Sequence, residues 1–533
     1  MGRVRSSGAA IAVATGILLS RISGLVRDRV FAYYLGSSHA AGAFRAAMKI
    51  PNFLQNLFGE GVLSASFIPV YASLRAQGRD QEAVQLAGAV ATLLALAVTT
   101  LATFGTLLTP MAIDLIAPGF TGDDRALTVQ LVQIMFPGVA LLVLSAWCLG
   151  ILNSHRRFLL PYMAPVLWNV AIIAALLVSG YVRPMTPAGQ VMLARDVAWG
   201  TIAGCVLQFA VQLPAALRLT RGIRVELALS SLSVRAVLKN FLPVVTSRGV
   251  VQLSAYIDQI LASFLGAPMV AALAYAQQLY LLPVSLFGMS ISAAALPAMS
   301  SVSGTTEVVQ EQIRSKIEQA LRRVCFFVIP SVVALAALGD VVVATVFQTG
   351  QFTQENVADV WLILAGSTLG LLASTQGRLC STAFYALRDA RTPLRFAVVR
   401  VVVTAAAGYV LALPLREAFG YTLAFGAASL TASAGLAGWV EFLLLRRALT
   451  QRLGAFNVPS VFVIKLWGIA GVAAACGFLL KNLLPPLYPA VTGCLVLGLY
   501  GILYLGSAMV FNLGEGAVLR RSLTKAYGRF YGP

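Results

Sequence analysis

The chain has 533 residues, of which 59% are hydrophobic and only 11% charged, and its formal net charge is +19. Soluble proteins carry about 25% charged residues, so this composition excludes a soluble globular protein. Apolar runs of about 18 residues or more recur from end to end. They predict an all-α polytopic membrane protein, because the strands of an outer-membrane β-barrel would be shorter and would alternate.

The apolar runs predict about fourteen transmembrane helices. Arg3 and Arg5 precede the first run, as in a signal peptide, but no clean cleavage site follows, and the run is interpreted as a retained helix. Many runs exceed about 25 residues, which implies tilt. The predicted spans are 8–35, 40–72, 85–112, 126–152, 158–181, 190–217, 236–266, 269–298, 320–347, 356–386, 393–414, 420–445, 458–480 and 488–512.

Basic residues predict the orientation of these spans. One set of alternate loops holds 24 of the 39 lysines and arginines, and the opposite set holds only Arg125, Arg183, Arg416 and Lys481. The positive-inside rule then places both termini in the cytoplasm. Because the charge is spread along cytoplasmic membrane edges, anionic membrane lipids explain it better than nucleic acid does.

The predicted organisation is two six-helix lobes and two further helices. Residues 1–217 form the N-terminal lobe, 218–235 a cytoplasmic linker that could be an interfacial amphipathic helix, and 236–450 the C-terminal lobe. Residues 451–533 supply the last two helices and a cytoplasmic tail. "NLFGEGVLSASFIPVYASL" in the second span resembles "SLFGMSISAAALPAMSSV" in the eighth, and such a repeat predicts lobes that face one another across a substrate path.

Few residues suggest metal or covalent chemistry. The six cysteines all occur in apolar segments without CxxC spacing, which indicates buried thiols. His39 and His155 are the only histidines, and no metal site or Ser-His-Asp constellation can be assembled from them.

Charged residues concentrate in the first two helices, where charge at membrane depth is costly. Arg21, Gly24 and Asp28 share one face of helix 1, with Arg27 beside Asp28. A polar stripe runs along helix 2 past Pro51, where a kink is expected. The stripe consists of Arg45, Lys49, Asn52, Asn56 and Glu60.

Further polar residues lie in helices 7 and 8. Arg248, Gln252 and Gln259 share a face of helix 7 near Asp258, and Gln277 and Gln278 lie in helix 8. Together these groups predict a water-filled cationic cavity that would suit an anion, phosphate in particular. Two alternatives remain open. Arg27 and Asp28 could be a self-neutralising packing pair, and residues such as Arg29 could extend to the membrane surface.

At these residues the sequence resembles the MurJ/MviN family of lipid II flippases, within the multidrug/oligosaccharidyl-lipid/polysaccharide exporter superfamily. The resemblance covers nearly the whole chain. The matching segments are "SRISGLVRD", "KIPNFLQNLFGEGVLSASFIPVY", "ASFLG", "FQTGQFT" and "YALRDARTP".

The resemblance implies a transporter, not an enzyme, that moves the undecaprenyl-diphosphate-linked peptidoglycan precursor across the bacterial inner membrane by alternating access, for cell wall biogenesis. It implies that the last two helices form a groove for the lipid tail. No cofactor is implied, although transport could be coupled to the membrane potential or a monovalent cation, and cell-wall synthesis machinery could be a partner. By motif, Arg21, Arg27 and Asp28 would be cavity residues on helix 1. The residues that match the family's helix 2 motif are Lys49, Asn52, Glu60 and Gly61. The candidate hinges are Gly24, Gly61 and Pro51.

The sequence departs from the family at Gly42, Gln55, Gln278 and Leu281, where other members often carry charge. Arg45 and Arg248 could restore the missing positive charge. Asp258 is a weak sodium candidate, because "FAVVRVVVTAAAGYVLAL" offers neither an acid nor an asparagine to complete a site.

Three other functions stay open. A related flippase could move another polyprenyl-linked glycan. A drug/cation antiporter should line its cavity with acids, whereas the deep charges here are mostly basic. A membrane glycosyltransferase should carry catalytic acids on large outer loops, whereas these are short, with Asp123 and Asp124 the only notable acids.

Overall fold

The computed structural model of the chain describes residues 2–254, 256–301 and 306–516, and within them every regular element is a helix. Twelve helices of this described part are long and apolar enough to cross a membrane. Of the other two predicted spans, 8–35 lies within the helix Gly2–Leu35, and 236–266 contains most of the helix Leu232–Ser254 and all of the helix Ile257–Ser263. The prediction of an all-α polytopic membrane protein is therefore confirmed.

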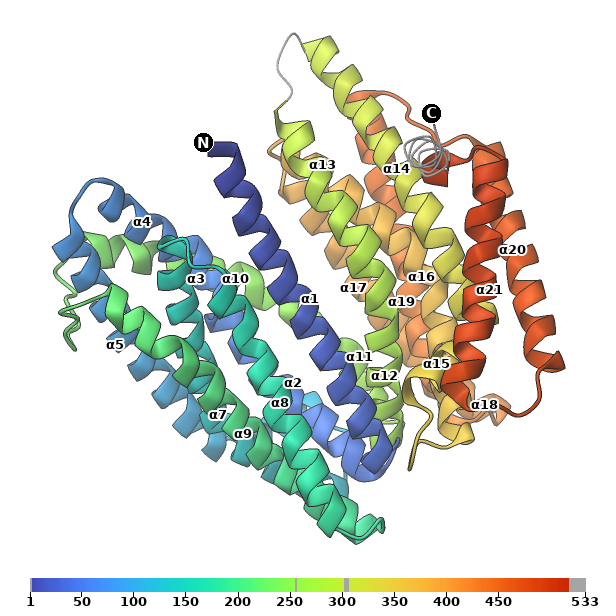
Figure 1. The fold of residues 1–533 in the computed structure, drawn as a ribbon, viewed down its shortest axis with the longest axis horizontal. Coiled ribbons are helices and arrows are strands. Elements are labelled where there is room, and N and C mark those ends of the chain that lie inside the picture. The colour runs from blue at the N-terminus through green and yellow to red at the C-terminus, as the bar shows by residue number, and fades with distance from the viewer. Residues whose placement is uncertain (1, 255, 302–305, 517–533) are drawn as a thin grey trace, which may run out of the picture. The chain divides into compact units, whose positions relative to one another are not determined.

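The helices pack into two compact units, residues 1–271 with 349–352 and residues 272–348 with 353–533. Figure 1 colours the first unit from blue to green and most of the second from yellow to red. The first unit contains α1 (Gly2–Leu35), α2 (His39–Phe58), α3 (Glu60–Ser66), α4 (Ile68–Ala76), α5 (Asp80–Leu107), α6 (Thr109–Ile116), α7 (Gly122–Ser154), α8 (Leu159–Val182), α9 (Pro187–Leu219), α10 (Leu232–Ser254) and α11 (Ile257–Ser263). Helix α12 (Ala267–Pro283) crosses the boundary, and the second unit continues with the π-helix η1 (Val284–Met289), α13 (Ser290–Ser300), α14 (Thr306–Ala337), α15 (Gly339–Phe347), α16 (Gln354–Ala386), α17 (Arg391–Ala412), α18 (Pro414–Phe419), α19 (Leu423–Leu453), α20 (Ser460–Leu483) and α21 (Pro489–Val510).

Small residues let the helices of the first unit approach closely. Helix α7 packs against α2, α5 and α9, and α1 packs along α8 (Figure 1). A Cβ atom added at Gly180 of α8 would lie 2.4 Å from the ring of Tyr34, and one at Gly204 of α9 would lie 2.7 Å from Trp168. Close backbone approach of this kind drives helix association where the surroundings are apolar.

The second unit is built around α16 and α19, which cross at two glycines. A Cβ atom added at Gly370 would lie 2.4 Å from the Cα atom of Gly435. Helices α20 and α21 pair with each other and pack on α14 and α15 (Figure 1). Tyr500 of α21 donates a hydrogen bond to the carbonyl of Pro330, and Tyr504 donates one to the carbonyl of Phe326.

The boundary between the units differs from the one predicted at 218–235. Helices α10 and α11 belong to the first unit, where α10 packs against α3. The linker is also not an amphipathic helix, because the backbone from Thr220 to Ser231 is not helical. Instead it runs against α5, where a Cβ atom at Gly88 would lie 2.5 Å from the carbonyl oxygen of Arg224.

Both repeated sequence segments contain a Phe-Gly pair, and in each segment the regular α-helix is interrupted at this pair. In the first, the helix breaks at Gly59, between α2 and α3, although Pro51 lies within continuous α2. In the second, Phe287 and Gly288 lie in the π-helix η1, between α12 and α13. Discontinuous helices at corresponding positions of two repeats are typical of transporters.

Candidate functional site

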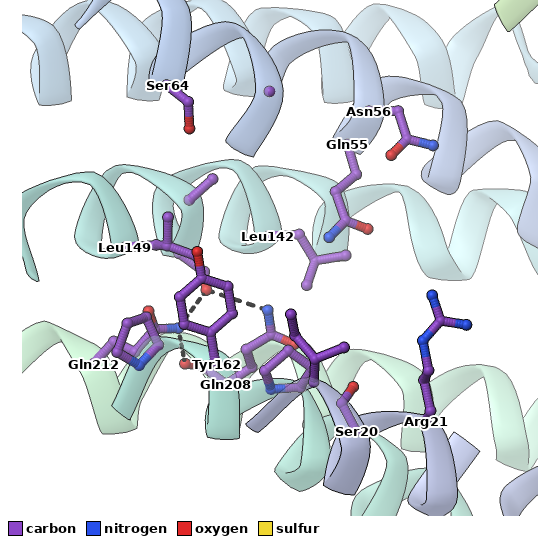
Figure 2. Close-up of a pocket in the computed structure, with 16 residues that line it drawn as sticks. Ser20, Arg21, Gln55, Asn56, Ser64, Leu142, Leu149, Tyr162, Gln208 and Gln212 are labelled. Atoms are coloured by element: carbon purple, nitrogen blue, oxygen red, sulfur yellow. Dashed lines mark hydrogen bonds between the residues drawn. The ribbon is translucent and has the colours of Figure 1, made fainter. Parts of the chain in front are cut away.

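The first unit encloses a cavity of about 730 Å³, which is within the size range of ligand-binding pockets. Helices α1, α2, α3, α7, α8 and α9 all contribute to its wall. Figure 2 draws the 16 lining residues. They are Ile17, Ser20, Arg21, Gln55, Asn56, Gly61, Ser64, Leu142, Ser145, Ala146, Leu149, Pro161, Tyr162, Pro165, Gln208 and Gln212.

Arg21 supplies the positive charge of this cavity. Its side chain is exposed, and Figure 2 shows its guanidinium group extending from α1 on the side of the cavity where Gln55 and Asn56 lie. None of the 16 lining residues is acidic. A guanidinium with neutral amide neighbours favours an anionic ligand, because its planar fork can donate two parallel hydrogen bonds to a phosphate.

A neutral polar cluster lies in another part of the same cavity. Gln208 and Gln212, one turn apart on α9, donate from their Nε2 atoms to the hydroxyl oxygen of Ser145 on α7, at 3.2 and 2.6 Å. The Nε2 atom of Gln212 also donates to the backbone carbonyl of Gln208. The three side chains are at most 8% exposed, and Figure 2 shows their hydrogen bonds as dashed lines.

Arg27, Asp28 and Arg45 form a separate buried cluster and do not belong to the cavity lining. Asp28 is 2% exposed, and its Oδ1 atom accepts hydrogen bonds from Arg27 at 3.0 Å and from Arg45 at 3.1 Å. Arg27 also donates to Asn169 and lies over the ring of Trp168. These contacts favour the packing alternative for the Arg27–Asp28 pair.

The remaining residues of the helix 2 stripe face different surroundings. Lys49 is half-buried and interacts electrostatically with Asp258 and Arg45. Asn52 is exposed on α2 and lies outside the cavity lining, whereas Asn56 belongs to it.

Several predicted residues lie elsewhere. Gln278 is half-buried on α12, in the second unit, and Leu281 is exposed on the same helix. Arg248 of α10 and Glu60 of α3 have helical backbones, and their side chains lie outside the described part of the structure.

The candidate hinge glycines lie at different surfaces of the first unit. Gly61 lines the cavity. A Cβ atom added at Gly24 would lie 3.8 Å from the Nδ2 atom of Asn169. Within the described residues, no group of three or more His, Cys, Asp or Glu side chains is placed to hold a metal ion.

Packing explains the departure from the family at Gly42. A Cβ atom at this position of α2 would lie 1.9 Å from the carbonyl oxygen of Ala267, at the start of α12. No side chain fits there without moving backbone, so the charged residue expected from the family resemblance is sterically excluded in this conformation.

Among the lining residues that were not predicted from the sequence are Ser145, Tyr162, Gln208 and Gln212. A signal for two of them exists. Gln208 and Gln212 are spaced i, i+4 within an apolar span, and this places two amides on one helix face.

The fold and the cationic cavity together define the class of protein as a multi-pass membrane transporter. The model of the family described as "Lipid II flippase MurJ" matches residues 31–498. The lipid II flippase MurJ of Burkholderia cenocepacia is 32% identical over 467 residues, which are 86% of each chain. A probable lipid II flippase MurJ of Rhizobium meliloti is 31% identical over 81% of this chain and 78% of its own. The chain belongs to the MurJ family of lipid II flippases.

Solved structures agree on the fold. A lipid II flippase MurJ in an inward closed conformation matches 94% of this chain and 98% of its own, with a TM-score of 0.73 and 23% identity. An inward-facing multidrug-resistance MATE transporter matches 83% of this chain and 98% of its own, with a TM-score of 0.64 and 19% identity. The MATE likeness extends to the fold alone.

Proposed function

We propose that this protein moves lipid II, the undecaprenyl-diphosphate-linked peptidoglycan precursor, from the cytoplasmic to the periplasmic leaflet of the bacterial inner membrane. The observation that carries the proposal is Arg21 on the wall of a cavity whose lining contains no acid. The diphosphate is an anionic part of lipid II, and the Arg21 guanidinium can bind it with parallel hydrogen bonds.

The same observation disfavours an antiporter for organic cations. Such a protein needs carboxylates to balance the charge of its substrate, whereas the only charged residue among the lining residues is an arginine. A flippase for another polyprenyl-linked glycan would share the diphosphate chemistry and differ only in the sugars it accepts.

The proposed transport cycle is alternating access. The helix interruptions at Gly59 and in the η1 π-helix are places where helices could bend during such a cycle. We further propose that both termini are cytoplasmic, that α20 and α21 hold the lipid tail, and that the membrane potential or a monovalent cation drives transport. The exposed apolar residues of these two helices, such as Ile464, Val472 and Ile502, support contact with lipid.

The test is complementation of a bacterium depleted of its own flippase. Arg21→Ala should abolish growth while the protein accumulates in membranes, and Arg21→Lys should restore it only partly, because lysine keeps the charge but loses the planar fork. Arg195→Ala is the matched control, since Arg195 is an exposed arginine of α9 outside the cavity lining. Full growth with Arg21→Ala at normal protein levels would contradict the role of Arg21 in anion binding.

Depletion also tests the substrate. Cells that lose this protein should accumulate lipid II in the cytoplasmic leaflet, which can be measured by labelling lipid II exposed on the periplasmic side. A normal periplasmic supply of lipid II after depletion would overturn the proposed function.

A further inference from the structure

The cluster of Ser145, Gln208 and Gln212 has hydrogen-bonding capacity that the protein leaves unused. A hydroxyl oxygen has two lone pairs and one hydrogen. Both lone pairs of the Ser145 oxygen accept from glutamine amides, so the remaining capacity of this hydroxyl is to donate. The Oε1 atom of Gln212 is buried, and within the described structure it has no hydrogen-bond partner.

Such a cluster is unusual in a membrane-spanning bundle. Buried polar atoms are normally paired, since burial without a partner is costly. Gln212 is 1% exposed and Ser145 is 2% exposed, yet both belong to the wall of the 730 Å³ cavity. A molecule that enters the cavity therefore meets two side chains that still have a donor and an acceptor to offer.

The chemistry of the cluster selects a neutral polar group. It offers one hydroxyl donor and one amide acceptor and carries no charge, so neither a phosphate nor an ammonium group would find a counter-charge there. A sugar hydroxyl or a secondary amide is complementary, because each can donate to Oε1 of Gln212 and accept from Ser145. Tyr162 also lines this cavity and adds an aromatic surface of the kind on which sugar rings pack.

The cluster and Arg21 occupy different parts of one cavity. Figure 2 shows Arg21 at one side, Gln212 at the other, and Gln208 between them. One ligand that carries both an anionic group and a neutral polar group can therefore use Arg21 and the glutamines together.

We infer that Ser145, Gln208 and Gln212 form a recognition subsite for the neutral sugar or amide portion of the headgroup, next to the diphosphate bound by Arg21. The inference rests on the proposed function and deepens it. It assigns specificity for the headgroup to α7 and α9, and affinity for the diphosphate to α1.

The test compares two probes on the purified full-length protein in nanodiscs. The probes are lipid II and undecaprenyl diphosphate, which carries the anion and the tail but no sugar. Gln212→Met keeps the length of the side chain and removes its hydrogen bonds. It should weaken lipid II binding about three- to tenfold, the value of a neutral hydrogen bond, and leave undecaprenyl diphosphate binding unchanged. Arg21→Ala should weaken the binding of both probes.

The matched control is Gln133→Met. Gln133 is a half-buried glutamine of α7 that bonds to the carbonyl of Thr106 and lies outside the cavity lining, so neither affinity should change. If Gln212→Met fails to accumulate, Ser145→Ala decides, because it removes the hydroxyl donor and leaves both amides in place.

The outcomes separate the two proposals. Wild-type protein that does not bind lipid II would overturn the proposed function. Wild-type protein that binds lipid II, with variants that bind it equally well, would overturn the subsite alone. A lower unfolding temperature in Gln212→Met without any loss of lipid II affinity would assign the cluster to packing or to an ordered water molecule, and would also overturn the subsite.

Discussion

Arg45 of α2 donates a hydrogen bond to Asp28 of α1, with 3.1 Å between Nη2 and Oδ1. The same oxygen accepts from Arg27, so one buried carboxylate holds two guanidinium groups from two helices. Arg45 also lies over the ring of Phe31, at 4.5 Å from its centroid. This cluster fixes α1 against α2.

Removal of Asp28 should therefore destabilise the protein. Asp28→Ala leaves two neighbouring arginines without their shared acceptor, and breaking a buried ion pair in this way costs about 3 kcal/mol. Arg27→Ala should lower the free energy of unfolding by less, because Asp28 keeps its ion pair with Arg45. Unfolding midpoints in detergent and protein levels in membranes measure both effects. If Asp28→Ala were as stable as the wild type yet inactive, Asp28 would act on substrate and not in packing.

Gly42 provides a second test, because the backbone of Ala267 leaves no room for a side chain at this position. Gly42→Asp, which introduces a charged side chain, should lower the free energy of unfolding by about 3 kcal/mol, because the new side chain would collide with the backbone of Ala267. Protein accumulation in membranes is the measurement. Gly468→Ala, in α20 where no atom lies within 4 Å of the added Cβ atom, is the matched glycine substitution. Normal accumulation of Gly42→Asp would show that α12 can move away from α2.

The sequence predicted the fold well because membrane insertion depends on local composition. Each span can be recognised from its own apolar run, so the helix pattern required no knowledge of packing. The predicted helix in the linker and the predicted unit boundary differ from the structure for the opposite reason. Whether α10 packs on α3 or on the second unit depends on contacts distant in sequence, which composition does not reveal.

The site was only partly predictable for a related reason. Polarity at membrane depth draws attention to Arg21 and to Arg27, but it does not separate a residue on a cavity wall from one that packs. That difference depends on residues from other helices. Asn169 accepts a hydrogen bond from Arg27 and orients it, and Arg45 pairs with Asp28. Ser145 was not predicted because a single serine in an apolar helix normally bonds to its own backbone.

Asp389 predicts a pH-dependent contribution to stability in the turn before α17. Its carboxylate accepts hydrogen bonds from the Thr392 hydroxyl at 2.7 Å and from the Thr392 amide, and it pairs with Arg452 at 2.7 Å. The Thr392 bonds, with the Arg452 pair, lower the pKa of Asp389 to about 2. Stabilisation by the charged form is thus present above about pH 3.8, the ordinary pKa of an aspartate, and is lost as the pH falls through about 2.

The comparison of wild type with Asp389→Asn measures this contribution. The wild type should unfold at a higher temperature from pH 7 down to about pH 4, and the difference should shrink toward pH 2, where the Asp389 carboxylate becomes protonated in the folded protein as well. Circular dichroism in detergent across this pH range is the measurement. A difference that persists unchanged at pH 2 would mean that the charge of Asp389 does not contribute.

Tyr504 completes a helix that a proline leaves unsatisfied. Pro330 has no N–H group, so the carbonyl of Phe326, four residues earlier in α14, lacks its usual intrahelical donor. The hydroxyl of Tyr504 donates to this carbonyl at 2.6 Å, and Tyr504 is buried. Tyr504→Phe should therefore cost about 1–3 kcal/mol, since it leaves a buried carbonyl unpaired. Tyr500→Phe should cost less, because the carbonyl of Pro330 lies in a helix that continues to Ala337 and has an intrahelical donor.

A double-mutant cycle with Pro330→Ala decides the cause of the loss caused by Tyr504→Phe. Alanine restores the missing N–H group, so the loss caused by Tyr504→Phe should shrink in that background. An equal loss in both backgrounds, measured by thermal unfolding in detergent, would assign the effect to packing of the ring against Phe326 instead.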